Sequence, residues 1–490
     1  MKTFKDFALS EDVLRALDVL EYKNPTEVQE VVIQELLDYE NVIVKSQTGS
    51  GKTAAFAIPL VENIDWDQRR PQALILTPTR ELALQIKEDI FNIGRFKRIR
   101  VEAIFGRASF EQQERALKGI VDLVVSTPGR LIDHIIRRTI DLSQVQTLII
   151  DESDEMLAMG FIDQIESILR KVPKNANIGL FSATMPDEIR DLGHRIMSDA
   201  KEIEIESVNL IEDRILQHVY HIEDHDKLES LKGILVVENP DSCILFCNTK
   251  ALVEAVADML WDLDIEVHTL HGDMEQRDRT KVITQFKRGQ FRYLVATDVA
   301  ARGLDIQDVQ LVVNVDIPEN AESYVHRIGR TARVDKQGKA ISIVNNYGKR
   351  FLEVILEETN NEILKMELPS KSFINSKVNS FNAKIARKPK LIKEKGLDFK
   401  EEIMKLHINA GKKTKMRPGD VVGALCSIEG ITMKDIGIIS VLDVSTFVEI
   451  LNNKGNIVLE ALQTQPVKGR VRNVNKANQS DYEKQLLENK

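Results

Sequence analysis

The chain is poor in cysteine and in aromatic side chains. Its 490 residues include three cysteines and two tryptophans, and aromatic residues make up 5% of the total. Three cysteines are too few for a disulfide framework, and Cys243 and Cys247 fall within one apolar run, which favours buried reduced thiols over zinc ligands. These shortages exclude a small secreted protein held together by disulfides.

The sequence also lacks a membrane-spanning or secretory segment. No apolar run reaches the roughly 20 residues that cross a bilayer, and the opening MKTFKDFALSEDV has neither the cationic flank nor the apolar core of a signal peptide. With 43% hydrophobic and 29% charged residues, the composition is that of a soluble globular protein long enough for about three domains. We expect a cytoplasmic protein.

Charge is distributed unevenly along the chain. The net charge is −9, yet residues 370–476 contain about 20 Lys and Arg against about 10 Asp and Glu. Nucleic acid is the partner expected for such a basic end, and a solvated basic linker is the alternative for part of it.

Two stretches of the chain alternate continuous apolar runs with helical patterns. Within residues 41–204 the runs are VIV, ALILT, DLVVST, TLIID and IGLFS, and within residues 242–344 they are SCILFCNTK, EVHTLHGD, YLVATDVAARG, LVVNVDIP and KAISIV. Runs without polar alternation are typical of parallel strands covered on both faces. We predict an α/β protein with two parallel-sheet domains in tandem and a hinge near residues 207–225.

The last quarter of the chain has a different pattern. Its first part is rich in Lys with scattered Pro, Ser and Asn, which predicts a mobile linker. Short half-buried strands around a helix at residues 420–430 then predict a small α+β domain of RNA-recognition type. The predicted segments are 1–206 and 207–369 for the two large domains, 370–402 for the linker, 403–477 for the small domain and 478–490 for a polar tail.

Residues 41–53, NVIVKSQTGSGKT, predict a buried strand, a glycine-bearing turn and a helix. The segment fits the phosphate-binding loop pattern, with Ser46 in place of its first glycine. Backbone N–H groups in such a loop converge on one point, and the helix adds the positive end of its dipole. Lys52 is predicted to neutralise nucleotide phosphates and Thr53 to help hold Mg²⁺. An ordinary Gly/Ser loop is the alternative.

Acidic and basic groups elsewhere complement this loop. Asp151 and Glu152 follow a buried strand, where one carboxylate can hold Mg²⁺ and the next can orient a water molecule, although such a pair is also common at a helix start. Arg327, Arg330 and Arg333 follow in YVHRIGRTAR, with the last two near one helical face. A nucleotide gripped between the two domains is predicted.

Eight segments, in order and at matching intervals, resemble the motifs of DEAD-box RNA helicases over about 370 residues. They are YKNPTEVQ, SQTGSGKT, PTREL, TPGR, DESD, SAT, ATDVAARGLD and HRIGRTAR. Further segments are IMKLHINAGKKTKMRPGDVVGALCSIEG, DIGIIS, VEILNNKG and VKGRVRNVNKA. Through them the basic C-terminal quarter resembles the DbpA subgroup, whose extra domain recognises a hairpin of large-subunit ribosomal RNA. The resemblance implies two RecA-like domains and a C-terminal RNA-binding domain.

The resemblance also implies roles in ATP binding and turnover. Tyr22 would stack on adenine, with Phe4 packing upstream, and Gln29 would hydrogen-bond the adenine edge because an amide both donates and accepts. The remaining nucleotide-binding positions that it implies are Ser46, Gln47, Thr48, Gly49, Ser50, Gly51, Lys52, Thr53 and, at the ribose, Asp305. The implied catalytic set is Lys52, Asp151, Glu152, His326, Arg330 and Arg333, with Mg²⁺ on Thr53 and Asp151 and the two arginines reaching across as fingers.

Other motif residues would face RNA or couple the domains. Asp154, Ser182, Thr184 and His326 would transmit domain closure, with local capping as the alternative. The RNA-facing positions of the core would be Thr79, Arg80, Thr127, Gly129, Arg130, Gly272, Gln276, Arg279 and Thr297, which would hold sugar and phosphate rather than base edges.

In the small domain, the aromatic surface of an RNA-recognition fold is reduced to one candidate, Phe447. Binding is therefore assigned to basic groups, which singly could be solvated surface charges and together favour the RNA backbone with a strong salt dependence. They are Lys412, Lys413, Lys415, Arg417, Lys468, Arg470 and Arg472.

Three positions depart from the family pattern. Ser153 replaces the usual Ala of the DEAD sequence, Ala332 replaces a Gly, and Gly106 with Arg107 replaces a pair of glycines. The first two departures are expected to preserve activity, and the third changes a position where the resemblance implies an RNA contact.

The sequence thus predicts an ATP-dependent RNA helicase that unwinds short duplexes and acts on 23S ribosomal RNA and pre-50S particles in ribosome assembly. An ATP-gated RNA clamp or scaffold without productive unwinding is the main alternative, and a DNA translocase is a third. ATP and Mg²⁺ are the expected cofactors, RNA rather than DNA or membrane is the expected partner, and a monomer is the expected state.

Overall fold

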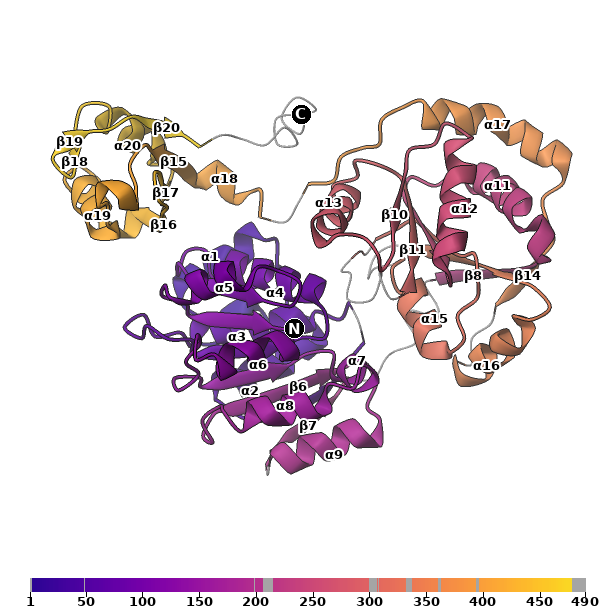
Figure 1. Cartoon of the computed structure of the whole chain (residues 1–490), viewed down its shortest axis with the longest axis horizontal. Coiled ribbons are helices and arrows are strands. Elements are labelled where there is room, and N and C mark those ends of the chain that lie inside the picture. Colours follow the sequence, from indigo (N-terminus) through magenta and orange to yellow (C-terminus); the bar gives the residue numbers. More distant parts are fainter. Residues whose placement is uncertain are drawn as a thin grey trace.

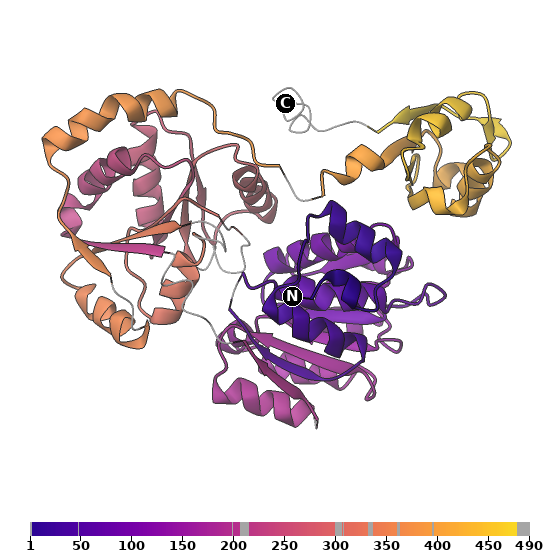
Figure 2. The ribbon, with the colours of Figure 1, turned by 180° about the vertical axis from the view of Figure 1, so that it is seen from behind.

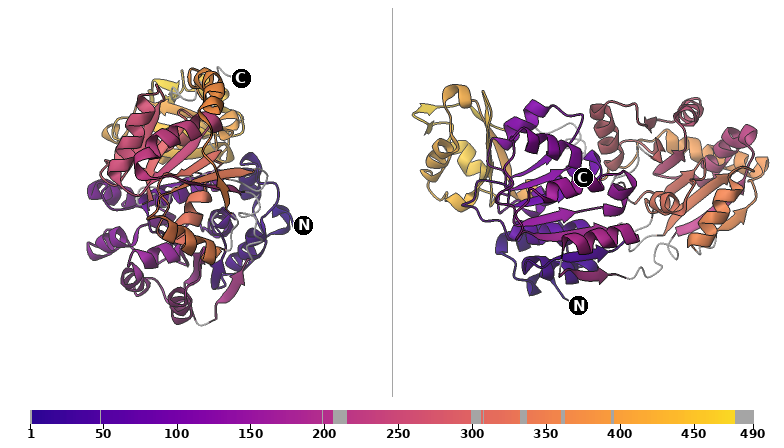
Figure 3. Two further views of the ribbon diagram at one scale, coloured as in Figure 1. Left: turned by 90° about the vertical axis from the view of Figure 1, so that its right-hand side faces the viewer. Right: turned by 60° about the horizontal axis from the view of Figure 1, so that its bottom comes forward.

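The chain folds into two large lobes and a small C-terminal domain (Figure 1). The computed structural model describes residues 2–47, 49–197, 199–205, 215–298, 306, 308–331, 337–359, 363–393 and 396–477. The first lobe lies between the second lobe and the C-terminal domain in the front, back and tilted views (Figures 1, 2 and 3). Among the described residues, no helix is both long and apolar enough to span a bilayer.

The first lobe is a seven-stranded parallel sheet in the order β3-β4-β2-β5-β6-β1-β7. Its central strands are fully buried because α1 to α4 cover one face and α6 to α9 cover the other. The strands are β1 Val42–Lys45, β2 Ala73–Leu76, β3 Val101–Ile104, β4 Leu123–Ser126, β5 Thr147–Ile150, β6 Asn177–Ser182 and β7 Lys201–Glu204. The helices are η1 Phe4–Asp6, α1 Glu11–Val19, α2 Glu27–Leu37, α3 Lys52–Glu62, α4 Arg80–Ile93, α5 Phe110–Leu117, α6 Pro128–Ile136, α7 Ser153–Ala158, α8 Ile162–Leu169 and α9 Asp187–Ile196.

The second lobe is also a seven-stranded parallel sheet, in the order β10-β11-β9-β12-β13-β8-β14. Helices α11, α12 and α17 cover one face, and α13, α15 and α16 cover the other. The strands are β8 Ile215–His221, β9 Cys243–Cys247, β10 Val267–Leu270, β11 Tyr293–Thr297, β12 Leu311–Asn314, β13 Gly338–Val344 and β14 Leu364–Met366. The helices are η2 Asp224–Asp226, α11 Lys227–Glu238, α12 Lys250–Trp261, α13 Gln276–Lys287, α15 Ala321–Ile328, α16 Lys349–Thr359 and α17 Lys371–Ile385.

The C-terminal domain is a four-stranded antiparallel sheet in the order β16-β17-β15-β20, with α19 and α20 packed on one face. Its strands are β15 Met404–Ile408, β16 Ile436–Val441, β17 Thr446–Ile450 and β20 Val474–Lys476, and a separate hairpin pairs β18 Pro466–Val467 with β19 Arg470–Val471. Its helices are α18 Phe399–Glu402, η3 Lys412–Thr414, α19 Pro418–Cys426, η4 Met433–Asp435 and α20 Gly455–Ala461.

The predicted fold class of two parallel α/β lobes and a small α+β domain is confirmed. Every predicted apolar run forms a strand, whereas β3, β7, β8 and β14 were not predicted. Residues 207–214 of the predicted hinge lie outside the described residues, and residues 215–221 form β8 of the second sheet. Polar side chains of β8 are buried because tertiary partners satisfy them, as when the Tyr324 hydroxyl donates to Gln217 at 2.8 Å.

The segment predicted to be a mobile linker contains a 15-residue helix, α17. Its lysines and asparagines obscure an apolar stripe of Ile374, Val378, Phe381 and Ile385, whose spacing of four, three and four residues puts them on one helical face. Phe381 is buried in the core of the second lobe. This part of the predicted linker therefore belongs to the second lobe.

Candidate nucleotide site and RNA-facing surfaces

The predicted phosphate loop joins β1 to α3, and its polar groups close on one another. Gly51 precedes α3 with a left-handed backbone, φ 96°. The Ser46 hydroxyl donates to the Ser50 hydroxyl at 2.7 Å, and the buried Lys52 ammonium donates to the Ser46 carbonyl at 2.5 Å. The Ser46 amide donates to the Ser182 carbonyl at 3.0 Å, so the loop is tied to the end of β6.

The other predicted loop residues surround this core. Gln47 and Thr53 are half-buried and Gly49 is exposed, while Thr48 lies outside the described residues. Thr53 sits in the first turn of α3, where the N-terminal end of the helix dipole favours an anion.

Gln29 and Thr26 connect α2 to the loop. The Gln29 amide nitrogen donates to the Gly51 carbonyl at 3.1 Å, and its oxygen accepts from the Thr26 amide at 3.0 Å. The Thr26 hydroxyl donates to the Ser50 carbonyl at 2.8 Å. The left-handed φ of Gly51 favours glycine, and a Cβ there would lie 2.4 Å from the Gln29 amide nitrogen and displace it.

Tyr22 lies just upstream of α2 and is half-buried. Its ring packs edge to face against Phe4, with ring centroids 6.2 Å apart. Part of the Tyr22 ring therefore stays accessible while Phe4 fixes its orientation.

Asp151 and Glu152 end β5 beside the phosphate loop. Burial raises the pKa of Asp151 to about 6, opposed by the charge of Lys52, and burial with the charge of Asp151 raises the pKa of Glu152 to about 7. Glu152 also has a left-handed backbone, φ 52° and ψ 51°, which is strained for a residue with a side chain. Two carboxyl groups forced together in this way form a site that favours a cation.

Asp154 is the centre of a hydrogen-bond network at the end of β6. One of its carboxylate oxygens accepts from the Ala183 amide at 3.2 Å, the Thr184 amide at 2.8 Å and the Thr184 hydroxyl at 2.9 Å. The Ser182 hydroxyl accepts from the Asp154 amide at 3.3 Å. These contacts stay within the first lobe.

Ser153 fills the position that departs from the family pattern. Its side chain is completely buried, and its hydroxyl donates to the Phe181 carbonyl at 3.1 Å. The extra oxygen is therefore satisfied, and the departure leaves no unpaired polar group.

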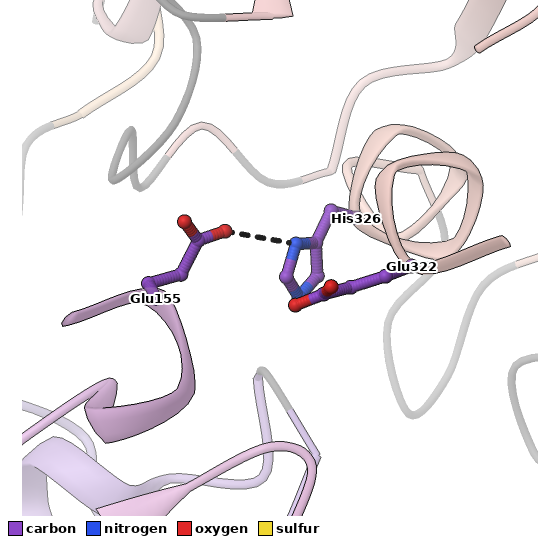
Figure 4. Close-up of side chains that lie close together, drawn as sticks. All are labelled: Glu155, Glu322 and His326. Carbon is purple, nitrogen blue, oxygen red and sulfur yellow. Dashed lines mark ion pairs between the residues drawn. The ribbon is translucent and has the colours of Figure 1, made fainter. Parts of the chain in front are cut away.

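The second lobe reaches this site through α15. The His326 imidazole Nδ1 lies 3.3 Å from the Glu155 carboxylate of the first lobe, and Glu322 of α15 lies beside them, with ligating atoms of all three within 4.8 Å of one another (Figure 4). The Arg330 Nε donates to the His326 carbonyl at 3.1 Å, and the Arg330 charge opposes the raised pKa of Glu152. Arg333 and Asp305 lie outside the described residues.

The neighbouring Arg327 has a different position. It is 2% exposed, and it donates to Asp298, to the Asn248 side chain at 2.8 Å, to the Asn314 side chain at 3.1 Å and to the Asp316 carbonyl at 2.7 Å. Arg327 therefore holds the second lobe together rather than facing the first.

Predicted RNA-facing residues of the first lobe gather at the start of α4 and α6. Burial lowers the pKa of the Arg80 guanidinium, Glu81 opposes this shift, and Arg107, Arg279 and Arg130 lower the pKa further. Because their charges act on Arg80, the other three arginines lie near it. Thr79 caps α4 by accepting from the Leu82 amide at 3.3 Å, whereas Thr127 and Gly129 lie at the start of α6.

The second lobe contributes one arginine to this cluster. Arg279 of α13 lies 3.0 Å from Glu81, and both side chains are 12% exposed. Thr297 is at the end of β11, Gly272 is exposed beyond β10, and Gln276 begins α13 with a side chain outside the described residues. The predicted RNA contacts of both lobes thus meet at Arg279.

Basic groups of the C-terminal domain converge from two loops. Lys468 donates to Asp420 at 2.9 Å and to the Lys415 carbonyl, and so joins the β18–β19 hairpin to η3. Arg472 is half-buried, and the other groups are exposed: Lys412, Lys413, Lys415, Arg417, Lys468 and Arg470. Phe447 lies on the sheet face away from the helices, half-buried and 5.0 Å from the His407 ring.

Sequence reasoning missed two residues of these sites. Glu155 and Glu81 are the partners of His326 and Arg279 across the lobes. Glu155 directly follows the DESD motif, and Glu81 lies within the PTREL motif. Arg107, which the sequence marks as a departure from the usual glycine, lies near Arg80 with φ 59°, a left-handed conformation that glycine adopts without strain.

Three family models match the chain. The model for DEAD/DEAH box helicases covers residues 26–192, that for the helicase conserved C-terminal domain covers 226–335, and that for the DbpA RNA binding domain covers 405–476.

Similar proteins extend these matches to nearly the whole chain. The ATP-dependent RNA helicase DbpA of Bacillus subtilis is 49% identical over 98% of this chain and all of that protein, and the helicase CshA of the same organism is 42% identical over 75% of this chain and 74% of that protein. The structure of S. cerevisiae Dbp5 bound to RNA and ADP BeF3 is 30% identical and covers 78% of this chain and all of its own, with a TM-score of 0.70. The resemblance seen in the sequence is confirmed: the chain belongs to the DEAD-box ATP-dependent RNA helicases and carries an RNA-binding domain of the DbpA type.

Proposed function

We propose that this helicase couples ATP hydrolysis to local RNA unwinding and that its C-terminal domain directs it to a hairpin of 23S ribosomal RNA during large-subunit assembly in the cytoplasm. One observation carries the ATP-dependent part. His326 of the second lobe lies 3.3 Å from Glu155 of the first, and its carbonyl accepts a hydrogen bond from Arg330 at 3.1 Å, so Arg330 is held where its charge, like that of Lys52, lowers the pKa of Glu152. A single carboxylate thus lies within reach of cations from both lobes, where a triphosphate would complete the set.

Each residue of the site would have one task. Lys52 and the N–H groups at the start of α3 would bind phosphate, Glu152 would orient the attacking water, and Arg330 with Arg333 would meet the charge on the transferring phosphoryl group. Asp151 and the Thr53 hydroxyl are the groups that would hold Mg²⁺, which supplies charge neutralisation when bound. The raised pKa values of Asp151 and Glu152 support this assignment, because burial disfavours both charged carboxylates and a bound cation would oppose that effect.

Adenine would be recognised by Tyr22 and Gln29, with Asp305 at the ribose. The half-buried Tyr22 ring, held by Phe4, offers a stacking face, and Gln29 is already fixed against the phosphate loop. Base recognition and phosphate binding would therefore occur on one connected framework.

RNA would bind across the arginine cluster of the two lobes. Arginine groups at the start of α4 and α6 favour phosphate and sugar, so the core would bind RNA without sequence preference. Binding would require Arg279 to exchange Glu81 for RNA, and His326 with Asp154, Ser182 and Thr184 would relay the change to the ATP site.

The first experiment compares RNA-stimulated phosphate release and duplex unwinding for Glu152→Gln and the parent. We expect loss of both activities by at least about 100-fold with ATP and RNA binding retained. Glu202→Gln, an exposed glutamate on β7, is the matched control. Turnover at the parent rate would contradict the role of Glu152. Normal hydrolysis by the parent without any unwinding would favour the clamp alternative.

The second experiment tests targeting with the full chain. The charge reversal Lys412→Glu, Lys413→Glu and Lys415→Glu should remove the preference for a 23S hairpin fragment over unrelated RNA and flatten the salt dependence of binding. Lys174→Glu on the first lobe is the control. An unchanged preference would defeat the targeting proposal, and equal activation by DNA of the same sequence would favour a DNA translocase.

A further inference from the structure

The C-terminal domain packs against the first lobe through a small apolar core. Phe399 of α18 is 1% exposed and is buried with Ile403 and Leu451 against Ala16 of α1 and Phe96, which follows α4. The Phe96 and Phe399 rings meet edge to face with centroids 5.6 Å apart. Both partners exclude water from this ring, so the contact has the buried apolar core of a specific interface.

Arginines of the first lobe surround this apolar core. Arg95 lies 2.9 Å from Glu449 of β17, and the two side chains are 16% and 5% exposed. Arg15 pairs with Glu402 and donates to the Asn452 side chain at 2.8 Å, and its guanidinium lies 4.1 Å from the Phe96 ring centroid. The buried pair matters most, because each charge would remain desolvated and unpaired if the other were removed.

Two further contacts fix the edges of this interface. The Arg98 guanidinium donates to the Met433 carbonyl at 2.6 Å. Gly396 has φ 82°, and a Cβ there would lie 2.9 Å from the Asn92 side-chain oxygen, so the chain passes against the first lobe where only glycine fits. The contact therefore extends from the entry of the domain to η4.

The docked surface leaves the proposed RNA-binding groups open. Glu449 is on the sheet face turned away from the domain's helices, because its neighbours Val448 and Ile450 point into the core. Phe447, two residues away on the same face, remains half-exposed beside His407. The first lobe thus covers one end of this face, and the basic loops at 412–415 and 468–472 lie elsewhere.

We propose that the C-terminal domain is a fixed extension of the first lobe and keeps this position while the second lobe moves. This position is independent of the proposed ribosomal target. The chain is held on the second lobe at Ile392, whose amide donates to the Arg288 carbonyl at 2.9 Å. It then meets the first lobe at Gly396.

The short connection between these two points limits how far the lobes can separate. Four residue steps reach at most about 14 Å. A wider opening requires either Ile392 to leave the second lobe or the C-terminal domain to leave the first. The docked domain therefore acts as a strap on the opening of the lobes.

Distances between fluorescent labels on the full chain test the proposal. Cys426 of α19 is exposed, whereas Cys243 and Cys247 are buried, so one native position accepts a label. The second label is placed by Ile136→Cys on the first lobe or by Trp261→Cys on the second, both exposed positions. Single-molecule energy transfer is measured without ligand and with RNA and a non-hydrolysable ATP analogue.

We expect the Cys426-to-136 transfer efficiency to form one narrow population that is unchanged by ligands. The Cys426-to-261 efficiency should shift when RNA and the analogue are added. The opposite pattern, a constant distance to the second lobe and a variable one to the first, would overturn the proposal.

Charge reversal tests the interface itself. Arg95→Glu should broaden the Cys426-to-136 distribution toward low efficiency, and adding Glu449→Arg should restore the narrow population. Arg70→Glu, at an exposed arginine paired with Asp141 on the first lobe, should have no effect. An unchanged distribution in Arg95→Glu would overturn the proposal. Glu449→Gln changes only the other partner and provides a second variant, with a smaller shift expected in the same direction.

Discussion

The two lobes share one strand order but end their first strands differently. Numbered within each lobe, both sheets run 3-4-2-5-6-1-7. In the first lobe β1 leads through a glycine-bearing turn into α3, which begins at Lys52. In the second lobe β8 leads through the acidic turn η2 into α11, which begins at Lys227. In both lobes, therefore, the helix after the first strand begins with a lysine, but the turn before it is glycine-bearing in one lobe and acidic in the other.

The difference lies in what each lysine contacts. Lys52 donates to a backbone carbonyl, whereas the Lys227 ammonium lies 2.8 Å from Asp224 and 2.7 Å from Asp316. Burial would lower the pKa of Lys227, but its hydrogen bonds to these carboxylates outweigh burial and raise it. Two carboxylates pair with Lys227, whereas Lys52 donates to a carbonyl of the candidate phosphate loop, so one fold yields a candidate phosphate site and a closed ion pair.

The largest expected effect separates two arginines at the same end of the second lobe. Arg330→Ala should lower RNA-stimulated ATP turnover by about 10³-fold with ATP binding retained, because a transition-state charge loses its partner. Arg327→Ala should instead lower the free energy of unfolding by about 3–5 kcal/mol, because buried partners lose their cation. Turnover assays and urea titrations check both. Full activity in Arg330→Ala would contradict the proposed contact of Arg330 with the transferring phosphoryl group.

The two lysines give the next test. Lys52→Ala should reduce turnover by about 100-fold through lost phosphate binding. Lys227→Ala should leave turnover within about threefold and lower the stability of the second lobe by about 3 kcal/mol, because Asp316 loses its buried partner. ATP-analogue titration and thermal unfolding distinguish the outcomes. Equal loss of ATP binding in both variants would contradict the different roles proposed for Lys52 and Lys227.

The acidic groups beside the two lysines differ in the direction of their pKa shifts. Hydrogen bonds to Lys227 lower the pKa of Asp224, whereas burial raises that of Glu152 to about 7. With its raised pKa, Glu152 binds a proton more tightly in the folded protein than in the unfolded chain. Protonation of Glu152 therefore stabilises the folded protein at low pH, and this stabilisation is lost as the pH rises through about 7. Glu152→Gln should therefore stabilise the ligand-free protein by about 1–3 kcal/mol at pH 8 and by almost nothing at pH 4.5. Urea titrations at both pH values test this, and a gain independent of pH would contradict it.

The smallest expected effect concerns Ser153. Ser153→Ala removes one buried hydrogen bond to the Phe181 carbonyl and should lower the free energy of unfolding by about 1 kcal/mol. Turnover should stay within about twofold, because the family pattern places alanine there. A loss of turnover larger than this would show that the hydroxyl has a functional role.

The sequence predicted what depends on continuous apolar runs and short motifs. Strands such as β2 and β9 were found because they are apolar throughout. β8 was missed because polar residues such as Gln217 are satisfied only by tertiary partners such as Tyr324. The helix α17 was missed because its Lys, Ser and Asn residues together outnumber its apolar residues, although four of the apolar residues share one face.

In the candidate site, too, the sequence predicts local motifs but not the tertiary partners of their residues. The positions around the phosphate loop follow from a contiguous motif, whereas the partners Glu155 and Glu81 depend on how two lobes meet. No local pattern states which carboxylate an imidazole or a guanidinium will find across an interface. The contact of Phe399 with Phe96 was unpredictable for the same reason.

The hydrogen bond from Gln29 to Gly51 has a consequence for nucleotide choice. The amide that would read the base also restrains the turn that curls around the phosphates. A guanine nucleotide would present the wrong donor and acceptor pattern to this amide and would disturb the turn as it bound. Discrimination between purines should therefore appear in the rate of hydrolysis as well as in affinity, although the base lies far from the bond that breaks.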